Sequence, residues 1–300
     1  MHDQTFTEFD RALTARWERT SATDRMLVAH VSNSHMLQPQ ETRRSILEDF
    51  PSPTWGREHL HGVVRELQSL SQRPDLLLLG GDMTHTGDPT EWDLLFATLS
   101  PLRVPLLFTL GNCEHRNNVI ESTTFQTSMA SLGKRGFGPG AVSGQLAYTR
   151  RVGSYQIVVL DSMHSGDLGA EQHEFLRKEL KGGRPTVVLV HRPILRTGQA
   201  VDQLRLIDPT YEQILADASN VAVVLCGHAH CRRTAIEQGR LHFLTPSVNF
   251  GNADPTGYRL VCLADGKVAW SGTRLVAGES CHAFRGPIIT QQGGTVWEEF

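Results

Sequence analysis

Five short apolar runs in this chain are each followed at once by polar residues of the kind that bind metal ions. The runs have the length of strands and are rich in Val and Leu, which is typical of strands buried on both faces. Helix-length segments separate several of them, so the pattern predicts an α/β fold in which helices cover the sheets. The runs are Met26–Val31, Leu76–Leu79, Val104–Leu110, Thr186–Val190 and Val221–Cys226.

The polar residues after these runs supply imidazole, carboxylate and amide oxygen, a mixture that suits Zn, Fe or Mn. In order along the chain they are Asn33 and His35, Asp82, Asn112 with Cys113 and Glu114, His191, and His228 with His230. Each element alone is weak, because a Gly-Asp after a strand is usually a turn and a lone His is usually structural. In open α/β sheets, however, ligands bind beyond the carboxyl ends of the strands. We therefore expect five loops to converge on one site.

Further elements can be predicted between and around these runs. Helices are expected over residues 55–70, from the Asp88-Pro89 start with Glu91 completing a variant capping box, and over about 170–180. Residues 145–151 and 155–160 are expected to form a hairpin, and the chain from Leu241 onward is strand-rich. The sequence thus predicts one domain over residues 26–300, preceded by a helical extension over residues 1–25.

The N-terminal extension has an amphipathic pattern. Phe6, Phe9, Leu13 and Trp17 recur three or four residues apart, which predicts a helix with one apolar face. Packing of that face on its own domain is the simpler interpretation, and a dimer arm is the alternative. A homo-oligomer is therefore left open.

Composition excludes several classes of function. The formal net charge of −3 gives no basic field for nucleic acid, and no apolar run approaches the ~20 residues of a membrane helix. The polar, acid-containing N-terminus does not resemble a secretory signal. Five cysteines without a CxxC pair argue against a disulfide framework. We expect a cytoplasmic protein that binds neither nucleic acid nor membrane.

The order of the polar blocks resembles that of the calcineurin-like metallophosphoesterases. The family order is D-x-H, G-D, G-N-H-[DE], a lone His, and G-H-x-H. It is matched here by Asn33-Ser34-His35, Gly81-Asp82, Gly111-Asn112-Cys113-Glu114, His191 and Gly227-His228-Ala229-His230. Residues 80–92 and 160–176 are similar to the branch of cyclic-nucleotide and glycerophosphodiester phosphodiesterases. The resemblance implies an αββα sandwich, in which two packed mixed β-sheets are flanked by helices.

The resemblance also implies a ligand set for two divalent metal ions, Mn, Fe or Zn. Asp82 bridges both metals; the first is completed by Asn33, His35 and His230, and the second by Asn112, His191 and His228. Two such cations clamp a phosphoryl group and an attacking hydroxide, so the implied reaction is hydrolysis of a phosphoester. The implied substrate is a small phosphorylated metabolite or a nucleotide. His85, His164 and Asn112 are candidate substrate-binding residues, although a solvated loop histidine is an equal alternative for the first two.

Two residues depart from the family pattern. Asn33 replaces an aspartate, which removes a negative charge from the first metal, so that site is expected to be the weaker one. Cys113 replaces the histidine thought to protonate the leaving group, and we take Cys113, with Asp82, as catalytic; Glu114 is interpreted as structural. These departures leave two alternatives to a phosphoesterase: a degenerate protein with a binding or regulatory role, and a metalloenzyme with a different reaction on the same scaffold.

Overall fold

The computed structural model describes residues 2–37, 54–115, 147–162, 166–195, 205–249, 255–275 and 294–300. The helices within these residues are α1 His2–Arg19, α3 Trp55–Ser69, α4 Pro89–Leu99, α6 Gly169–Leu180 and α7 Pro209–Asp217. The strands are β1 Arg25–Val31, β2 Leu76–Leu79, β3 Leu106–Phe108, β4 Tyr148–Val152, β5 Tyr155–Val159, β6 Thr186–Leu189, β7 Val221–Cys226, β8 Arg233–Glu237, β9 Arg240–Leu244, β10 Gly257–Ala264, β11 Lys267–Leu275 and β12 Thr295–Glu299.

The strands form two mixed sheets of six strands each. The first has the order β12-β11-β10-β1-β2-β3, and the second has the order β4-β5-β6-β7-β9-β8. In the first sheet β1, β2 and β3 are parallel neighbours, while β10 joins β1 in antiparallel pairing. In the second sheet β5, β6, β7 and β9 are parallel. The carboxyl ends of the five strands with polar successors therefore lie at one edge of the two sheets.

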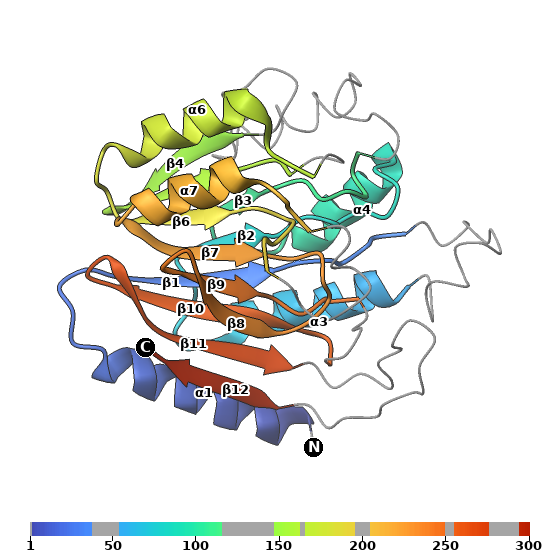
Figure 1. Ribbon diagram of the computed structural model, residues 1–300. Coiled ribbons are helices and arrows are strands. Elements are labelled where there is room, and N and C mark those ends of the chain that lie inside the picture. The colour runs from blue at the N-terminus through green and yellow to red at the C-terminus, as the bar shows by residue number, and fades with distance from the viewer. Residues whose placement is uncertain are drawn as a thin grey trace.

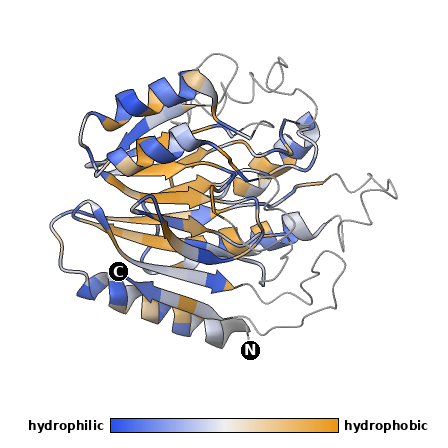
Figure 2. Cartoon of the chain, in the orientation of Figure 1, coloured by the Kyte–Doolittle hydropathy of each residue, from blue (hydrophilic) through white to orange (hydrophobic). Residues whose placement is uncertain are grey.

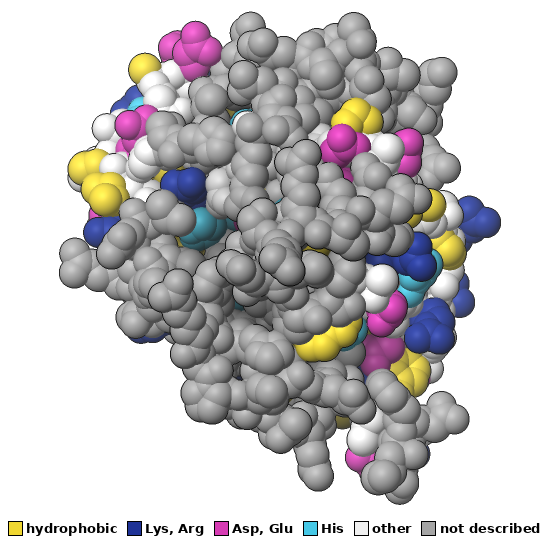
Figure 3. All heavy atoms as spheres, turned by 90° about the vertical axis from the view of Figure 1, so that its right-hand side faces the viewer, with side chains coloured by type: hydrophobic (Ala, Val, Ile, Leu, Met, Phe, Trp, Pro, Cys, Tyr) yellow, Lys and Arg dark blue, Asp and Glu magenta, His cyan; other side chains and the backbone are white. Residues whose placement is uncertain are grey.

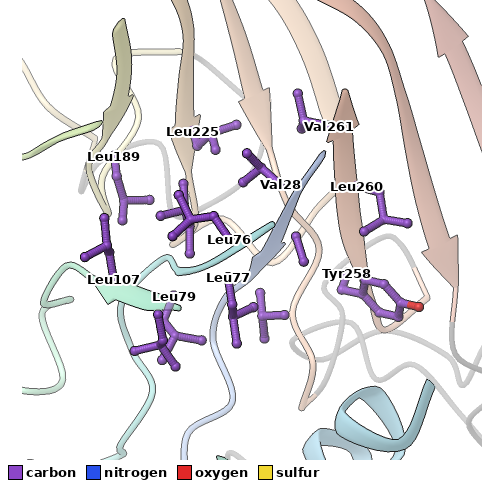
Figure 4. Packing of buried hydrophobic residues seen from close by; sticks show 14 of the residues in the cluster. Val28, Leu76, Leu77, Leu79, Leu107, Leu189, Leu225, Tyr258, Leu260 and Val261 are labelled. Atoms are coloured by element: carbon purple, nitrogen blue, oxygen red, sulfur yellow. The ribbon is translucent and has the colours of Figure 1, made fainter. Parts of the chain in front are cut away.

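The two sheets pack face to face. Along the strands of the second sheet, successive side chains belong alternately to the core between the sheets and to a cluster on the outer face. Val187 and Leu189 join the main core between the sheets, whereas Val188 and Val190 join a second cluster with residues of α6 and α7. Figure 4 shows Leu189 and Leu225 of the second sheet among Leu107, Leu76 and Val28 of the first. The strands are accordingly the most apolar part of the chain in Figure 2.

Helices cover the outer faces of both sheets (Figure 1). Buried residues of α3 and α4 belong to the main core with the first sheet, and α6 and α7 pack on the second. The order of layers is helix, sheet, sheet, helix, so the predicted αββα sandwich is confirmed. The apolar runs predicted from the sequence form strands because apolar layers cover both of their faces.

The predicted elements are found with shifted ends. The run Val104–Leu110 is a strand only over Leu106–Phe108, and residues 145–146 of the expected hairpin lie outside the described part of the chain. Asp88 caps α4, since its side chain accepts a hydrogen bond from the N–H of Thr90 at 2.9 Å. The Glu91 carboxylate reaches further back than a capping box requires, to the N–H groups of His85 and Thr86 at 3.0 and 2.8 Å. It thereby fixes the loop that carries His85.

Helix α7 and strand β8 were not predicted from the sequence. Asp208 and Pro209 form the same start signal as Asp88 and Pro89, and the Asp208 side chain accepts from the N–H of Tyr211 at 2.9 Å. The signal could therefore have been found. Strand β8 has no apolar run that could have predicted it. It is extended because it pairs with β9 at the sheet edge.

Helix α1 packs against the edge of the first sheet, where β12 lies alongside it in Figure 1. Phe9 and Leu13 are buried in the main core, and the Phe9 ring stacks on Trp297 of β12 with ring centroids 6.0 Å apart. The expected apolar face of the helix thus contacts its own chain. Among the described helices none is long and apolar enough to span a membrane.

Candidate metal centre

The loops after β1, β2, β3, β6 and β7 meet at the carboxyl edge of the sheets, the face shown in Figure 3. Backbone hydrogen bonds tie them together. The N–H of Asn33 donates to Gly81 O at 3.0 Å, the N–H of His35 donates to Asp82 O at 2.9 Å, and the N–H of Gly227 donates to His191 O at 3.0 Å. The two sheets are joined here by Ser247, whose hydroxyl donates to Asn33 O at 2.8 Å. Predicted ligands from both sheets are therefore held in one rigid cluster.

Two triads of side chains share the carboxylate of Asp82. The ligand atoms of His35, Asp82 and His230 all lie within 4.8 Å of one another, and so do those of Asp82, His191 and His228. Because Asp82 belongs to both triads, they comprise five different residues, and every one of them is buried. The division is the one that the family resemblance implies for a first and a second metal bridged by Asp82.

The backbone at these ligands is unusual. Asn33, His35, Asp82, His228 and His230 all have positive φ, between 42° and 65°. Non-glycine residues rarely adopt this region, and such strain tends to collect at functional sites, where the surrounding structure enforces it. The sharp turns bring His35 and His230 into one triad and His228 into the other, on the two sides of Asp82. Gly111 is required nearby because a Cβ there would collide with the Asp82 side chain.

The residues of the second metal fit a divalent cation. The Nδ1 of His191 lies 2.7 Å from Gly80 O, so Nδ1 carries the proton and Nε2 keeps its lone pair. That Nε2 lies 3.4 Å from Asp82 Oδ2. Within the described residues the Nε2 atoms of His191 and His228 and the Oδ1 of Asn112 are buried without a hydrogen-bond partner. Buried acceptors of this kind are costly unless a ligand satisfies them.

Protonation at this site favours metal binding. Burial, followed by the nearby His191, holds the pKa of His228 well below its usual range, so its imidazole stays neutral. Burial would raise the pKa of Asp82, but the neighbouring His191 and His35 outweigh it and hold that pKa well below normal. A neutral imidazole and an ionised carboxylate are the forms that ligate metals.

Three of the four residues expected at the first metal are placed to bind a cation. The Nε2 atoms of His35 and His230 lie 3.1 Å apart, and His35 Nε2 lies 3.9 Å from Asp82 Oδ2. The Oδ1 of Asn33, however, accepts the N–H of His228 at 3.2 Å. The Nδ2 of Asn33 is buried with no partner among the described residues. This neutral oxygen has one of its two lone pairs engaged, so it is a weaker fourth ligand than a carboxylate would be.

Glu114 fixes the relative position of two ligand loops. Its carboxylate accepts from the N–H groups of Asp82, Gly111 and Thr84 and from the Thr84 hydroxyl, at 2.7–2.9 Å. The structural role predicted for Glu114 matches these contacts. Burial and the neighbouring Asp82 raise the pKa of this carboxyl.

Cys113 is buried between ligand residues. Its N–H donates to Asp82 Oδ1 at 2.8 Å, and its Sγ lies 3.7 Å from His35 Nδ1 and 3.7 Å from Asn112 Nδ2. His85 is part of the same cluster, because ligand atoms of His35, His85 and Cys113 all lie within 4.8 Å of one another. The remaining candidate, His164, lies outside the described residues.

Four further polar residues near the centre were not predicted as site residues. His115 and Asp161 form a buried pair, with His115 Nε2 2.8 Å from Asp161 Oδ1, and this pairing raises the pKa of His115 against the effect of burial. Gln172 of α6 holds Asp161 through its backbone. Arg192 directly follows the ligand His191 and is buried. His115 and Arg192 could have been noticed because each adjoins a ligand block.

Comparison with known proteins decides the family. The sequence profile of the calcineurin-like phosphoesterases matches residues 26–232, which is most of the chain and all five ligand blocks. The chain belongs to the calcineurin-like phosphoesterase family. The family expectation is thereby confirmed, and membership implies divalent metal ions at the centre described above.

Relatives agree with this membership, and a solved structure has the same fold. A protein of Synechococcus sp., named a probable cyclic nucleotide phosphodiesterase, is 29% identical over 57% of this chain and 63% of its own length. A glycerophosphodiester phosphodiesterase of Enterobacter lignolyticus is 26% identical over 68% of this chain and 71% of its own. The structure of a dimetal phosphatase from Danio rerio superposes with a TM-score of 0.61 at 12% identity, over 83% of this chain and 95% of that one.

Proposed function

We propose that this calcineurin-like phosphoesterase hydrolyses a phosphodiester or phosphomonoester of a small metabolite or nucleotide at a dinuclear metal centre. The observation that carries the proposal is the pair of buried triads that share Asp82, since a single carboxylate between two sets of histidines is the arrangement that two adjacent cations need. The names of the relatives, which are phosphodiesterases for cyclic nucleotides and glycerophosphodiesters, favour the same class of substrate.

Each group of residues has a distinct part in this proposal. Bound divalent cations would supply Lewis acidity toward the phosphoryl group and an activated water. His191, His228, Asn112 and Asp82 would hold the second cation, and His35, His230 and Asp82 the first. Cys113 would lie beside the phosphoryl group, with Asn112 Nδ2 near its sulfur. Mn, Fe and Zn all suit this set of nitrogen and oxygen donors.

A degenerate protein that keeps the fold for binding is the second candidate. The engagement of Asn33 Oδ1 by the N–H of His228 favours it, because the fourth ligand of the first metal is then a weak, neutral oxygen. The same scaffold can serve unrelated roles. The second site keeps its whole predicted ligand set, so we place the hydrolase first. We further propose a cytoplasmic protein whose partner is a small phosphorylated substrate rather than nucleic acid or membrane.

Metal analysis combined with a substrate panel tests the proposal. Purified protein is assayed on phosphomonoesters, cyclic nucleotides and glycerophosphodiesters with Mn, Fe, Co, Ni or Zn added back. We expect hydrolysis with two metals bound, and His228→Ala is expected to lose bound metal at unchanged fold. Metal-loaded protein that hydrolyses none of these esters would support the degenerate alternative, and full metal retention by His228→Ala would refute the ligand assignment.

A further inference from the structure

Arg192 is a buried arginine that has no counter-charge among the described residues. Its side chain and backbone together are 5% exposed, and its guanidinium Nε is buried without a hydrogen-bond partner. Its N–H donates to the Ser162 hydroxyl at 3.2 Å, which fixes the backbone between His191 and the loop after β5. No carboxylate of the described residues lies within 4.0 Å of its nitrogens.

The other two buried arginines among the described residues are ion-paired, although the Nε of Arg259 also lacks a hydrogen-bond partner. Arg259 pairs with Glu298 at 3.3 Å, donates to the Ser271 hydroxyl at 2.9 Å and lies 4.4 Å from the centre of the Phe243 ring. Arg274 donates to both oxygens of Glu66. An ionised group in the interior is expensive unless it is paired. Arg192 therefore needs an anion that the described residues do not supply.

Arg192 adjoins the metal centre, because it follows the ligand His191 directly in the chain. After burial and His191, its positive charge is among the causes that lower the pKa of His228. The negative charge of Asp82 in turn acts on Arg192. Asp82 is already engaged by the N–H of Cys113 and lies between two triads of ligands, so it is not available to pair with Arg192.

The charge at this centre favours an anionic ligand. Of the seven predicted metal ligands only Asp82 is a carboxylate, because Asn33 stands at the position of a second one. Guanidinium groups bind phosphate through two parallel N–H donors. We propose that the Arg192 guanidinium binds the non-bridging oxygens of the phosphoryl group in the substrate and in the inorganic phosphate product. This inference rests on the proposed function and adds a specificity residue to the same site.

Binding of inorganic phosphate tests the inference without relying on turnover. Phosphate affinity is measured by titration calorimetry on metal-loaded wild type, Arg192→Met and Arg192→Lys, with metal content determined in each. We expect Arg192→Met to weaken phosphate binding by about 10- to 100-fold, as for a lost charged hydrogen bond. Arg192→Lys keeps the positive charge but lacks the two parallel N–H donors of a guanidinium. We expect its phosphate affinity to lie between those of wild type and Arg192→Met. Unchanged phosphate affinity in both variants at equal metal content would overturn the inference.

Thermal unfolding without phosphate separates this role from a structural one. Replacing a buried unpaired charge by Met is expected to leave the melting temperature of Arg192→Met unchanged or raised. Arg259→Met is the matched control and is expected to melt at a lower temperature, since it removes the ion pair with Glu298 and the hydrogen bond to Ser271. An Arg192→Met variant that melts as low as Arg259→Met and binds phosphate like wild type would show a structural arginine. Wild type that hydrolyses no ester but needs Arg192 for phosphate binding would refute the proposed function and leave the inference intact.

Discussion

At the scale of single residues, Asn33 is the departure with the largest electrostatic consequence. Its oxygen accepts the N–H of His228 instead of facing a cation unopposed. Restoring the carboxylate with Asn33→Asp leaves one oxygen for that N–H and provides a second, charged one. We expect first-site affinity to rise about tenfold or more, because a unit charge pair at ~4 Å in a protein environment interacts by roughly 4 kcal/mol.

A metal titration of wild type and Asn33→Asp in parallel checks this prediction, with bound metal and activity followed together. The variant should reach two bound metals, and higher phosphodiesterase activity, at lower added metal. Coinciding curves would mean that residue 33 is not a ligand and that the match of the first block is wrong. Activity gained from an inert parent would favour the degenerate protein.

Cys113 poses the second question at this scale. If its thiol protonates the leaving group, Cys113→Ala should slow esters with poor leaving groups by about 10²- to 10⁴-fold and nitrophenyl esters far less. Rates on both ester types, measured at equal metal content, check this. Cys226→Ala is a suitable control, since Cys226 is a buried strand cysteine whose pKa is raised by burial alone. Equal losses on both esters for Cys113→Ala would assign it a positioning role.

At the scale of elements, strand β9 carries a buried histidine that makes stability depend on pH. His242 is fully buried, and burial lowers its pKa to about 4 from 6.5. Above pH 6.5 both the folded and unfolded chains keep this imidazole neutral, so its contribution to stability is complete. As the pH falls toward 4 only the unfolded chain takes up the proton, and the free energy of unfolding decreases by about 3 kcal/mol.

His242→Leu should remove this part of the acid sensitivity. Denaturant unfolding of wild type and variant at pH 7 and at pH 4.5 gives the comparison, and the pH 7 values serve as the control for repacking. We expect the free energy of unfolding of the variant to rise relative to that of wild type by about 2–3 kcal/mol between pH 7 and pH 4.5. Parallel pH curves for the two proteins would show that His242 titrates normally in the folded chain.

At the scale of the whole molecule, α1 completes the core at the edge of the first sheet. Leu13 is fully buried in the main core, and Phe9 lies between Trp297 and the Arg274 guanidinium. Leu13→Ala should therefore lower the free energy of unfolding by about 2–5 kcal/mol, as for other leucines in a packed core. Arg11→Ala on the exposed side of the same helix should change it by less than about 0.5 kcal/mol.

Unfolding at several protein concentrations separates this prediction from the dimer-arm alternative. Loss of stability that is independent of concentration agrees with packing within one chain. A loss that appears only at low concentration would indicate that α1 contributes to an interface between chains.

The sequence by itself determined the α/β class with helix-covered sheets and the five ligand blocks, and the αββα arrangement came from the family resemblance. Apolar runs covered on both faces, such as Leu76–Leu79, leave little choice but a buried strand, and the polar residues after them necessarily come at the carboxyl ends. Those features depend on the local chain alone. Only the tertiary structure decided that the Asn33 oxygen accepts the N–H of His228, that the Glu114 carboxylate accepts the N–H of Asp82, and that Arg192 is buried. The contacts of Glu114 with Asp82 and of Asn33 with His228 join residues 32 and 195 positions apart, and no local pattern fixes which donor meets which acceptor across that distance.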